Sequence, residues 1–248
     1  MNEGRASKYL LYAIGEIFLV VIGILIALQV NNWNEVRKEA RQEVIYLNQL
    51  RSEFKSDSIN LRRSSFLVNW KVKQADTLLH MIEGQPLGID TLSFIRNAFL
   101  IGRSVIFMPY LPTYEELISS GQINLISNKK LSDLIRAYIN RMEGLNRFSF
   151  MEGEKRKETY NTHLYNYCSA EIMPVFWKTE MVREGKDFMK KIALMEMDIS
   201  GFIRDPNSRI QVQNTKATDM ELSFLYTQTM ERHIIPIIEM IEDELDNN

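Results

Sequence analysis

The chain has 248 residues, of which 45% are hydrophobic, 25% charged and 10% aromatic. This composition is typical of folded domains and excludes a disordered or collagen-like chain. Lys+Arg 30 against Asp+Glu 32 leave a formal net charge of -2, so no basic excess attracts nucleic acid. The single cysteine, Cys168, excludes an intramolecular disulfide and a cysteine-cluster metal site. With only 11 glycines and 6 prolines, long uninterrupted helices are favoured.

Residues 9–30 form the most apolar stretch and are long enough to span a bilayer as a helix, although Glu16 interrupts them. Two tyrosines before the apolar core and Trp33 after it lie where aromatic rings prefer the headgroup layers. No cleavage site with small residues follows. We therefore predict a retained single-pass transmembrane helix in contact with the lipid bilayer. The predicted organisation is a short tail (1–8), the transmembrane helix (9–30) and a helical soluble domain (31–248).

Basic residues flank both ends of this segment, so the positive-inside rule gives nearly a tie. Arg5 and Lys8 precede it, and Arg37, Lys38 and Arg41 follow it. A tail of this length is easily left in the cytoplasm while a large C-terminal domain crosses the membrane. We expect the N-terminus inside and the soluble domain outside.

The run Y-A-I-G-E-I-F-L-V-V-I-G-I-L-I-A-L-Q-V-N-N-W-N-E, residues 12–35, resembles the N-terminal signature of an uncharacterised family of single-pass membrane proteins from Bacteroidota. The stretch T-Y-E-E-L-I-S-S-G-Q-I-N-L-I-S-N-K-K-L, residues 113–131, is similar to the soluble-domain motif of that family. The resemblance implies a protein of the bacterial inner membrane whose soluble domain lies in the periplasm. It implies no activity, substrate, cofactor or catalytic residue.

Glu16 lies about two turns inside the predicted span, where an ionisable group is costly unless it is paired, solvated or protonated. It either sits in the interfacial layer or contacts another helix, and a proton-handling role is the third possibility. Gly23 and Ala27 form a small-residue pair that allows helices to approach closely. Glu16, Gly23 and Ala27 are therefore the candidate residues for packing the membrane helix against its own copy, in a homo-oligomer, or against a membrane protein partner.

Beyond Trp33 no glycine or proline occurs before Gly84, which predicts one helix from the membrane to about Glu83. Every seventh position within it, the a position of a heptad, is apolar, whereas the d positions Asp57 and Lys71 are polar. So narrow a seam predicts packing inside a helical bundle rather than a two-stranded coiled coil. The apolar positions are Ala40, Leu47, Phe54, Leu61, Val68, Ala75 and Ile82, and Ser64 is a third polar d position.

The rest of the chain predicts shorter helices of an all-α bundle. Asp90 caps a helix ending near Gly102, and residues 104–112 form a buried loop. Thr113 and Glu116 form a capping box for a short helix that Gly121 closes. Three further helical segments are expected: one capped by Ser127 or Asn128 that runs to about Ile172 and is stopped by Pro174, one over Lys186–Ile203, and one over Arg209–Leu245 with a kink near Pro236.

No motif for an enzyme appears: the nucleophile elbow, the phosphate-binding loops and paired metal-binding histidines are all missing from the sequence. We therefore expect neither catalysis nor a cofactor nor a metal, and we expect Cys168 to be a buried free thiol. The basic run at residues 154–158 indicates a solvated helix face. The densest group of polar and aromatic residues, at residues 160–168, forms either a ligand pocket or the edge of the core. The candidate pocket residues are Tyr114, Tyr160, His163 and Tyr167.

These observations favour a membrane-anchored, non-enzymatic helical domain that acts as a scaffold, adaptor or accessory subunit of a membrane assembly. The alternative is an extracytoplasmic sensory module that binds a small ligand within its bundle.

Overall fold

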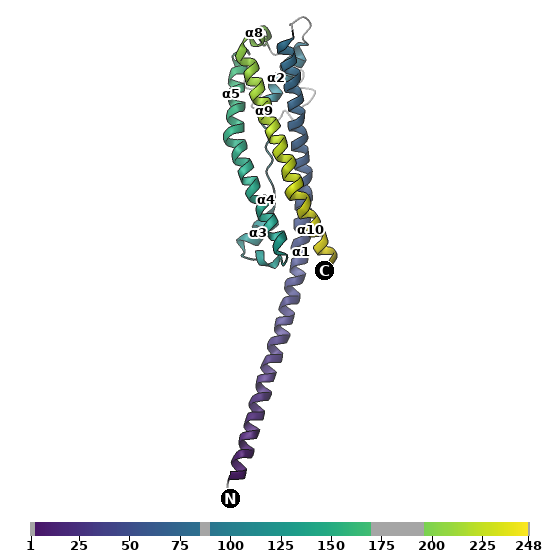
Figure 1. The fold of residues 1–248 in the computed structure, drawn as a ribbon, viewed down its shortest axis with the longest axis vertical. Helices are drawn as coiled ribbons and strands as arrows, with labels where there is room; N and C mark the ends of the chain where they lie inside the picture. Colours follow the sequence, from purple (N-terminus) through teal and green to yellow (C-terminus); the bar gives the residue numbers. More distant parts are fainter. Residues whose placement is uncertain (1–2, 85–89, 170–195, 248) are drawn as a thin grey trace.

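The computed structural model describes residues 3–84, 90–169 and 196–247, with side chains from Gly15 onward (Figure 1). Within these ranges every regular element is a helix, which confirms the all-α prediction. The elements are α1 (Glu3–Glu83), α2 (Thr91–Ile101), α3 (Pro112–Ser119), the 3-10 turn η1 (Ile123–Leu125), α4 (Lys129–Phe148), the π segment η2 (Ser149–Gly153), α5 (Glu154–Tyr165), α8 (Ile199–Arg204), α9 (Pro206–Thr229), the π segment η5 (Met230–Ile234) and α10 (Ile235–Asn247).

Helix α1 is one continuous helix of 81 residues, about 120 Å long at 1.5 Å per residue. Its N-terminal part projects from the bundle as a bare rod (Figure 1). All side chains from Gly15 to Gln42 are exposed, and Glu43 is the first buried residue. The N-terminal part is long and apolar enough to cross a membrane, with a mean hydropathy of 1.8. The predicted continuity from the apolar segment to Glu83 is confirmed.

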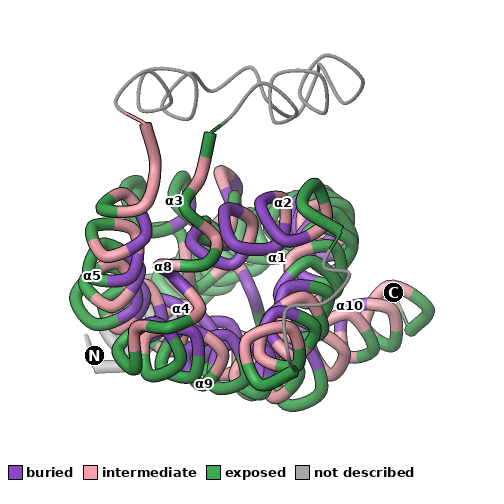
Figure 2. The backbone as a smooth tube through the Cα atoms, turned by 90° about the horizontal axis from the view of Figure 1, so that it is seen from above, coloured by how far each residue is buried: buried purple, intermediate pink, exposed green. Residues whose placement is uncertain are grey.

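Three long rods form the bundle: α1, the α4–η2–α5 rod and the α9–η5–α10 rod, the last running back toward the base (Figure 1). An end-on view shows the buried side of each rod turned inward (Figure 2). Two apolar clusters fill the interior. One, around Phe54 and Tyr138, lies toward the end of the bundle where the apolar rod emerges. The other, around Phe94 and Phe202, lies toward the far end.

The heptad pattern of α1 faces this interior. Ala40 lies below the bundle and is exposed, and Ile82 is half-buried. The other five apolar positions are fully buried: Leu47, Phe54, Leu61, Val68 and Ala75. The polar d positions Asp57 and Lys71 are buried as well, because each meets a polar partner from another segment. The bundle interpretation of the seam is therefore confirmed.

Residues 104–111 have no helical structure and connect α2 to α3. Tyr226 of α9 holds this segment: its hydroxyl donates to the carbonyl of Val105 at 3.1 Å and accepts from the amide of Phe107 at 3.1 Å. Phe107 is buried, whereas Met108 and Tyr110 are largely exposed. The predicted non-helical segment is confirmed, but it is only half-buried because successive side chains of an extended chain point to opposite sides.

The predicted capping box of α3 is wrong. The helix begins at Pro112, two residues before the start that a cap at Thr113 predicts, and its N-cap Leu111 offers no side-chain hydrogen bond. Instead Glu53 of α1 accepts from both the amide of Thr113, at 3.1 Å, and its hydroxyl, at 2.5 Å. A carboxylate from a neighbouring helix thus satisfies the free N–H that a capping side chain would otherwise satisfy.

Gly121 closes α3 as predicted. It has a φ of +72°, and its amide donates to the carbonyl of Ile118 at 3.2 Å. The amide of Gln122 donates to the carbonyl of Leu117 at 2.9 Å. This pair of bonds is the Schellman motif, in which glycine is preferred because the left-handed conformation costs it nothing.

The other helix boundaries confirm some predictions and correct others. Asp90 and Asn128 cap α2 and α4 with their side chains, as expected. The rod that starts with α4 ends at Tyr165 rather than near Ile172. Pro174 and most of the helix predicted over residues 186–203 lie outside the described residues, which show α8 alone of that helix.

The last rod begins at Pro206 rather than Arg209. Asp205 precedes it, and its side chain accepts from the amide of Asn207 at 2.8 Å. Proline suits the first helical position because the amide hydrogen that it lacks would have no partner there. The disturbance expected near Pro236 takes the form of the π segment η5, which ends two residues before that proline.

Candidate functional site: a buried lysine pair beside a small cavity

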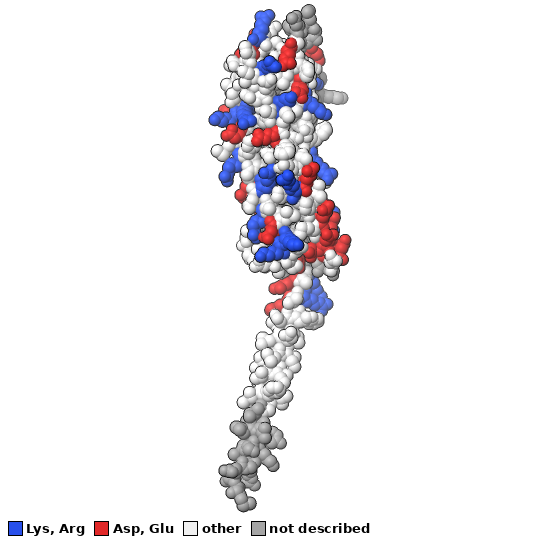
Figure 3. All heavy atoms as spheres, in the orientation of Figure 1, with Lys and Arg blue, Asp and Glu red and all other residues white. Residues whose placement is uncertain are grey.

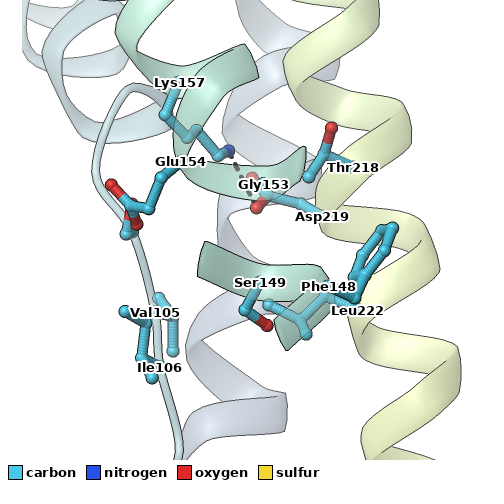
Figure 4. A pocket seen from close by; sticks show the side chains of 11 residues that line it. Val105, Ile106, Phe148, Ser149, Gly153, Glu154, Lys157, Thr218, Asp219 and Leu222 are labelled. Carbon is cyan, nitrogen blue, oxygen red and sulfur yellow. Dashed lines mark ion pairs between the residues drawn. The ribbon is translucent and has the colours of Figure 1, made fainter. Parts of the chain in front are cut away.

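Three charged side chains from three helices meet inside the bundle. Lys71 comes from α1, Lys157 from α5 and Asp219 from α9, and each is at most 5% exposed. Lys157 Nζ lies 2.8 Å from Asp219 Oδ1, and Lys71 Nζ lies 3.3 Å from Asp219 Oδ2. Figure 4 shows Lys157 and Asp219 pointing toward one another. The three side chains therefore tie the three rods together.

The lysines also hold the end of α2 and the residues after it. Lys157 Nζ donates to the carbonyl of Ile101 at 3.0 Å, and Lys71 Nζ donates to the carbonyl of Arg103. Carbonyls at a helix C-terminus lack intrahelical partners and carry partial negative charge. The second lysine is thus partly compensated by the end of α2, since Asp219 supplies only one negative charge.

Two cations and one carboxylate leave an excess positive charge in the interior. Burial lowers the pKa of Lys157 to about 7, the nearby Lys71 ammonium lowers it further, and Asp219 opposes both effects. A buried ammonium that loses its hydration releases its proton more easily. The cluster can therefore take up or release a proton near neutral pH.

A small cavity adjoins the cluster and has about 20 Å³ of free space. That is room for about one water molecule, because a single water needs at least ~10–15 Å³. Lys157 and Asp219 line it together with α4, the π segment η2 and α9 (Figure 4). On its wall Ser149 Oγ is buried without a hydrogen-bond partner, and Asp219 Oδ2 faces the Lys71 ammonium at 3.3 Å but accepts no hydrogen bond. The arrangement suits one bridging water and is too small for an organic substrate.

A second buried polar group lies nearer the emerging rod. Asp57 accepts from the hydroxyl of Tyr138 at 3.1 Å and from the amide of Tyr110 at 3.2 Å. Burial raises the pKa of Asp57 to about 6, although both hydrogen bonds act in the opposite direction. Together with Glu53, Asp57 makes α1 the acceptor that holds the 104–113 segment in place.

Three of the four predicted pocket residues come together, and their polar atoms are bonded within the protein. Tyr160 is fully buried and donates to the carbonyl of Ala98 at 2.6 Å. His163 Nε2 lies 2.8 Å from the hydroxyl of Ser208. Tyr167 donates to the side chain of Asp205 at 2.6 Å.

The fourth, Tyr114, lies on α3 against the other core cluster. The other three pack against the far cluster: the ring centroids of His163 and Tyr167 lie 5.7 Å and 5.4 Å from that of Phe202. A ligand pocket shared by all four residues stays a prediction, and the observed geometry is that of a packed core edge.

The candidate membrane-packing residues lie along α1 on the exposed rod. Glu16 and Gly23 are seven residues apart, and Ala27 follows four residues later, so the three share one face of the helix. A side chain placed at Gly23 would meet no atom within 4 Å. Their packing against another helix stays a prediction.

Sequence reasoning missed the lysine cluster, and the interpretation of residues 154–158 as a solvated face is wrong for Lys157. Its neighbours in that run are more exposed, whereas Lys157 is 4% exposed. One signal was present: Lys71 occupies an interior position of the α1 heptad, which requires a buried counter-charge. Which acidic residue supplies it, among the 32 of the chain, depends on the packing of α9 against α1.

Cys168 is half-buried rather than buried, and burial raises the pKa of its thiol to about 11. A thiol with so high a pKa is a poor nucleophile at neutral pH. Among the described residues no group of three or more histidine, cysteine or acidic side chains is placed to hold a metal ion.

Comparison with known proteins identifies a family. A family model described as "Family of unknown function (DUF6090)" matches residues 16–195. No curated protein and no solved structure matches. The matched range starts within the apolar segment of α1 and covers well over half of the chain, including Lys71 and Lys157. The chain therefore belongs to this family of unknown function, DUF6090.

Proposed function

We propose that the protein is a membrane-anchored, non-enzymatic helical module that acts as a scaffold, adaptor or accessory subunit of a membrane assembly. One observation carries the proposal: α1 runs without a break from an exposed apolar segment into the bundle, where it is one of the three long rods. A large apolar surface is stable only when it is covered, and lipid is the covering that an apolar span of this length suits.

The stalk between this segment and the bundle is helical throughout. About 12 residues separate Val30 from Glu43, which places the base of the domain ~18 Å above the end of the span at 1.5 Å per residue. In the view of Figure 3 no charged side chain is visible on the white part of the rod, and charged side chains appear just below the domain. Such a stalk holds the domain at a fixed height, as a scaffold requires.

The proposal places the helix in a bacterial inner membrane, with a single pass and the domain in the periplasm. It rests on the resemblance of residues 12–35 to the anchor signature of Bacteroidota proteins. Alkaline phosphatase fused after Asn248 should be active on this orientation. An inactive phosphatase, together with fluorescence from a cytoplasmic reporter fused at the same position, would show that the domain lies in the cytoplasm.

The alternative, a sensory module, receives less support from the geometry. Tyr160, His163 and Tyr167 already use their polar atoms on groups of the protein itself. A ligand there would have to displace these bonds and separate the aromatic rings. The scaffold interpretation needs no such rearrangement.

Chemical cross-linking in native membranes tests the scaffold role. The full chain should be recovered joined to a second protein or to its own copies, whereas residues 1–42, the anchor and stalk alone, serve as the control and should give a much lower yield. Recovery of the full chain only as an uncross-linked monomer, with several cross-linkers of different reach, would contradict the proposal.

A further inference from the structure

Three basic side chains of the stalk lie on one side of α1. Arg37, Lys38 and Arg41 are all exposed, and they span about 100° of the helix surface at 3.6 residues per turn. Together they form the basic face of the stalk. Within the described residues the lowest ion pair of α1 joins Lys55 to Glu242, so no carboxylate of that part of the chain pairs with the basic face.

The acidic residues of the stalk lie on a different side. Glu35 and Glu39 are about 130° around the helix from the middle of the basic face. Glu35 also accepts a hydrogen bond at 3.3 Å from the side chain of Asn31. In Figure 3 the acidic and the basic side chains just below the domain appear on opposite sides of the rod. The stalk therefore presents a positive side to its surroundings although its summed charge is small.

The side chain of Arg37 points toward the apolar segment. Its guanidinium carbon lies 5.7 Å from the centroid of the Trp33 ring, and Trp33 is four residues nearer the N-terminus. Side chains of a helix lean toward its N-terminus, and long basic side chains extend further in that direction when their charge is attracted there. The charges of the basic face are thus lower than the backbone positions that carry them.

The basic face also lies at the right height to meet lipid headgroups. Counting from Val30, the end of the predicted span, Trp33 is ~5 Å, Arg37 ~10 Å and Arg41 ~16 Å away at 1.5 Å per residue. The headgroup layer on each side of a bilayer is about 5–8 Å deep. Trp33 lies within it, Arg37 and Lys38 reach it with their leaning side chains, and Arg41 stands outside.

We propose that the basic face binds the phosphates of anionic phospholipids, so that the stalk gathers acidic lipids on one side of the membrane helix. Basic residues beside a span are attracted to anionic headgroups. The inference rests on the proposed membrane anchoring. A free phosphate ion offers the same chemistry, but the place of the basic face beside the span favours phosphates that are fixed in the membrane.

Photo-cross-linking tests this with the full chain in nanodiscs that contain equal amounts of phosphatidylglycerol and phosphatidylcholine. A photoreactive phenylalanine derivative replaces Asn34, which lies between Arg37 and Lys38 around the helix, and mass spectrometry identifies the captured lipid. Phosphatidylglycerol should be captured about threefold or more over phosphatidylcholine. The same derivative at Asn32, about 160° away around the helix, should show a smaller excess.

Two double variants separate the basic face from basic residues in general. Arg37→Gln combined with Lys38→Gln should bring the capture ratio at position 34 close to one. Arg62→Gln combined with Arg63→Gln is the matched control, because both residues are exposed and lie ~48 Å or more above Val30. This control should leave the ratio unchanged.

The lipid proposal is wrong if the wild type captures both lipids equally, or if the variant of Arg37 and Lys38 keeps the excess. Inorganic phosphate in place of chloride, at equal ionic strength, should not change the ratio. Loss of the excess in phosphate would show that the basic face binds a free ion instead. A chain that resists extraction from the membrane but captures both lipids equally would leave the anchoring standing, whereas a chain that never enters the membrane would contradict both.

Discussion

At the scale of single residues, the buried cluster of Lys71, Lys157 and Asp219 is the most unusual chemical feature of the described structure. A buried charge is tolerated only with a counter-charge and hydrogen bonds. Among the described residues, Asp219 is the one carboxylate that both ammonium groups contact. Its loss would leave two like charges facing each other in the interior, whereas the loss of one lysine would relieve repulsion.

Asp219→Ala should therefore destabilise the domain by about 3–5 kcal/mol, the cost of an uncompensated buried charge. Lys157→Met should cost much less, because a flexible apolar side chain fills similar space and removes the excess positive charge. Asp133→Ala, at a largely exposed ion pair with Arg136, is the control. Denaturant unfolding of the full chain measures all three, and equal costs for Asp219→Ala and Lys157→Met would refute the account.

The same cluster predicts a dependence of stability on pH. Lys157 has a pKa of about 7 in the fold against 10.5 when unperturbed, so between these values the unfolded chain binds more protons than the folded one. Stability should rise from pH 7 to pH 9 through this group, by at most ~1.4 kcal/mol per pH unit. The difference in slope between wild type and Lys157→Met isolates the effect. Parallel profiles for the two proteins would show that Lys157 keeps an ordinary pKa.

At the scale of elements, carboxylates of α1 accept hydrogen bonds from the segment of residues 110–127 that packs on it. Glu43 accepts from the amide of Ser127 at 2.6 Å, Glu53 from Thr113 and Asp57 from Tyr110. Three carboxylates along one helix thus hold the start of α3, the segment before it and the segment before α4. The conformation of this region therefore depends on α1 as well as on the local caps at Gly121 and Asn128.

Glu53→Ala should loosen α3, because the amide and hydroxyl of Thr113 would lose their shared acceptor. The expected cost is about 1–2 kcal/mol, the range measured for lost N-caps. Amide hydrogen exchange should accelerate in α3 and remain unchanged in α9. Glu39→Ala, on the exposed stalk, serves as the control, and protection of α3 equal to that of the wild type would refute the role of Glu53.

At the scale of the whole molecule, the continuity of α1 predicts that the apolar segment and the domain move as one body. Neither glycine nor proline occurs between Gly23 and Gly84, and every residue of this range up to Glu83 is helical. Kinks in helices usually come from proline, glycine or an inserted residue. A motion or force on the domain would therefore be transmitted along the stalk to the apolar segment.

Spin labels at Gln29 and Glu39 should report one narrow distance distribution, with about 15 Å between backbone positions at 1.5 Å per residue. Insertion of two glycines after Asn34 should broaden it and serves as the comparison. Measurement by electron paramagnetic resonance in nanodiscs is direct. A broad distribution for the uninterrupted chain would mean that the junction bends.

Local patterns in the sequence were sufficient for the helices and for many of their ends. The apolar span, the lack of glycine and proline up to Gly84, the caps Asp90 and Asn128 and the glycine at 121 all act within a few residues of their own position. Such short-range preferences can be recognised without the fold. The sequence also predicted that α1 packs in a bundle, because the a positions of its heptads are apolar and several d positions are polar.

The tertiary structure alone decided which distant residues meet. Glu53 of α1 replaces the expected cap of α3. Lys157, predicted to be solvated, is instead buried and paired with Asp219. Tyr114 and Tyr160 lie in different core clusters. Each outcome depends on how α9 and the 104–128 segment pack on α1. From sequence alone a charged side chain is predicted to be solvated, because the free-energy cost of burying it depends on a counter-charge that only the fold identifies.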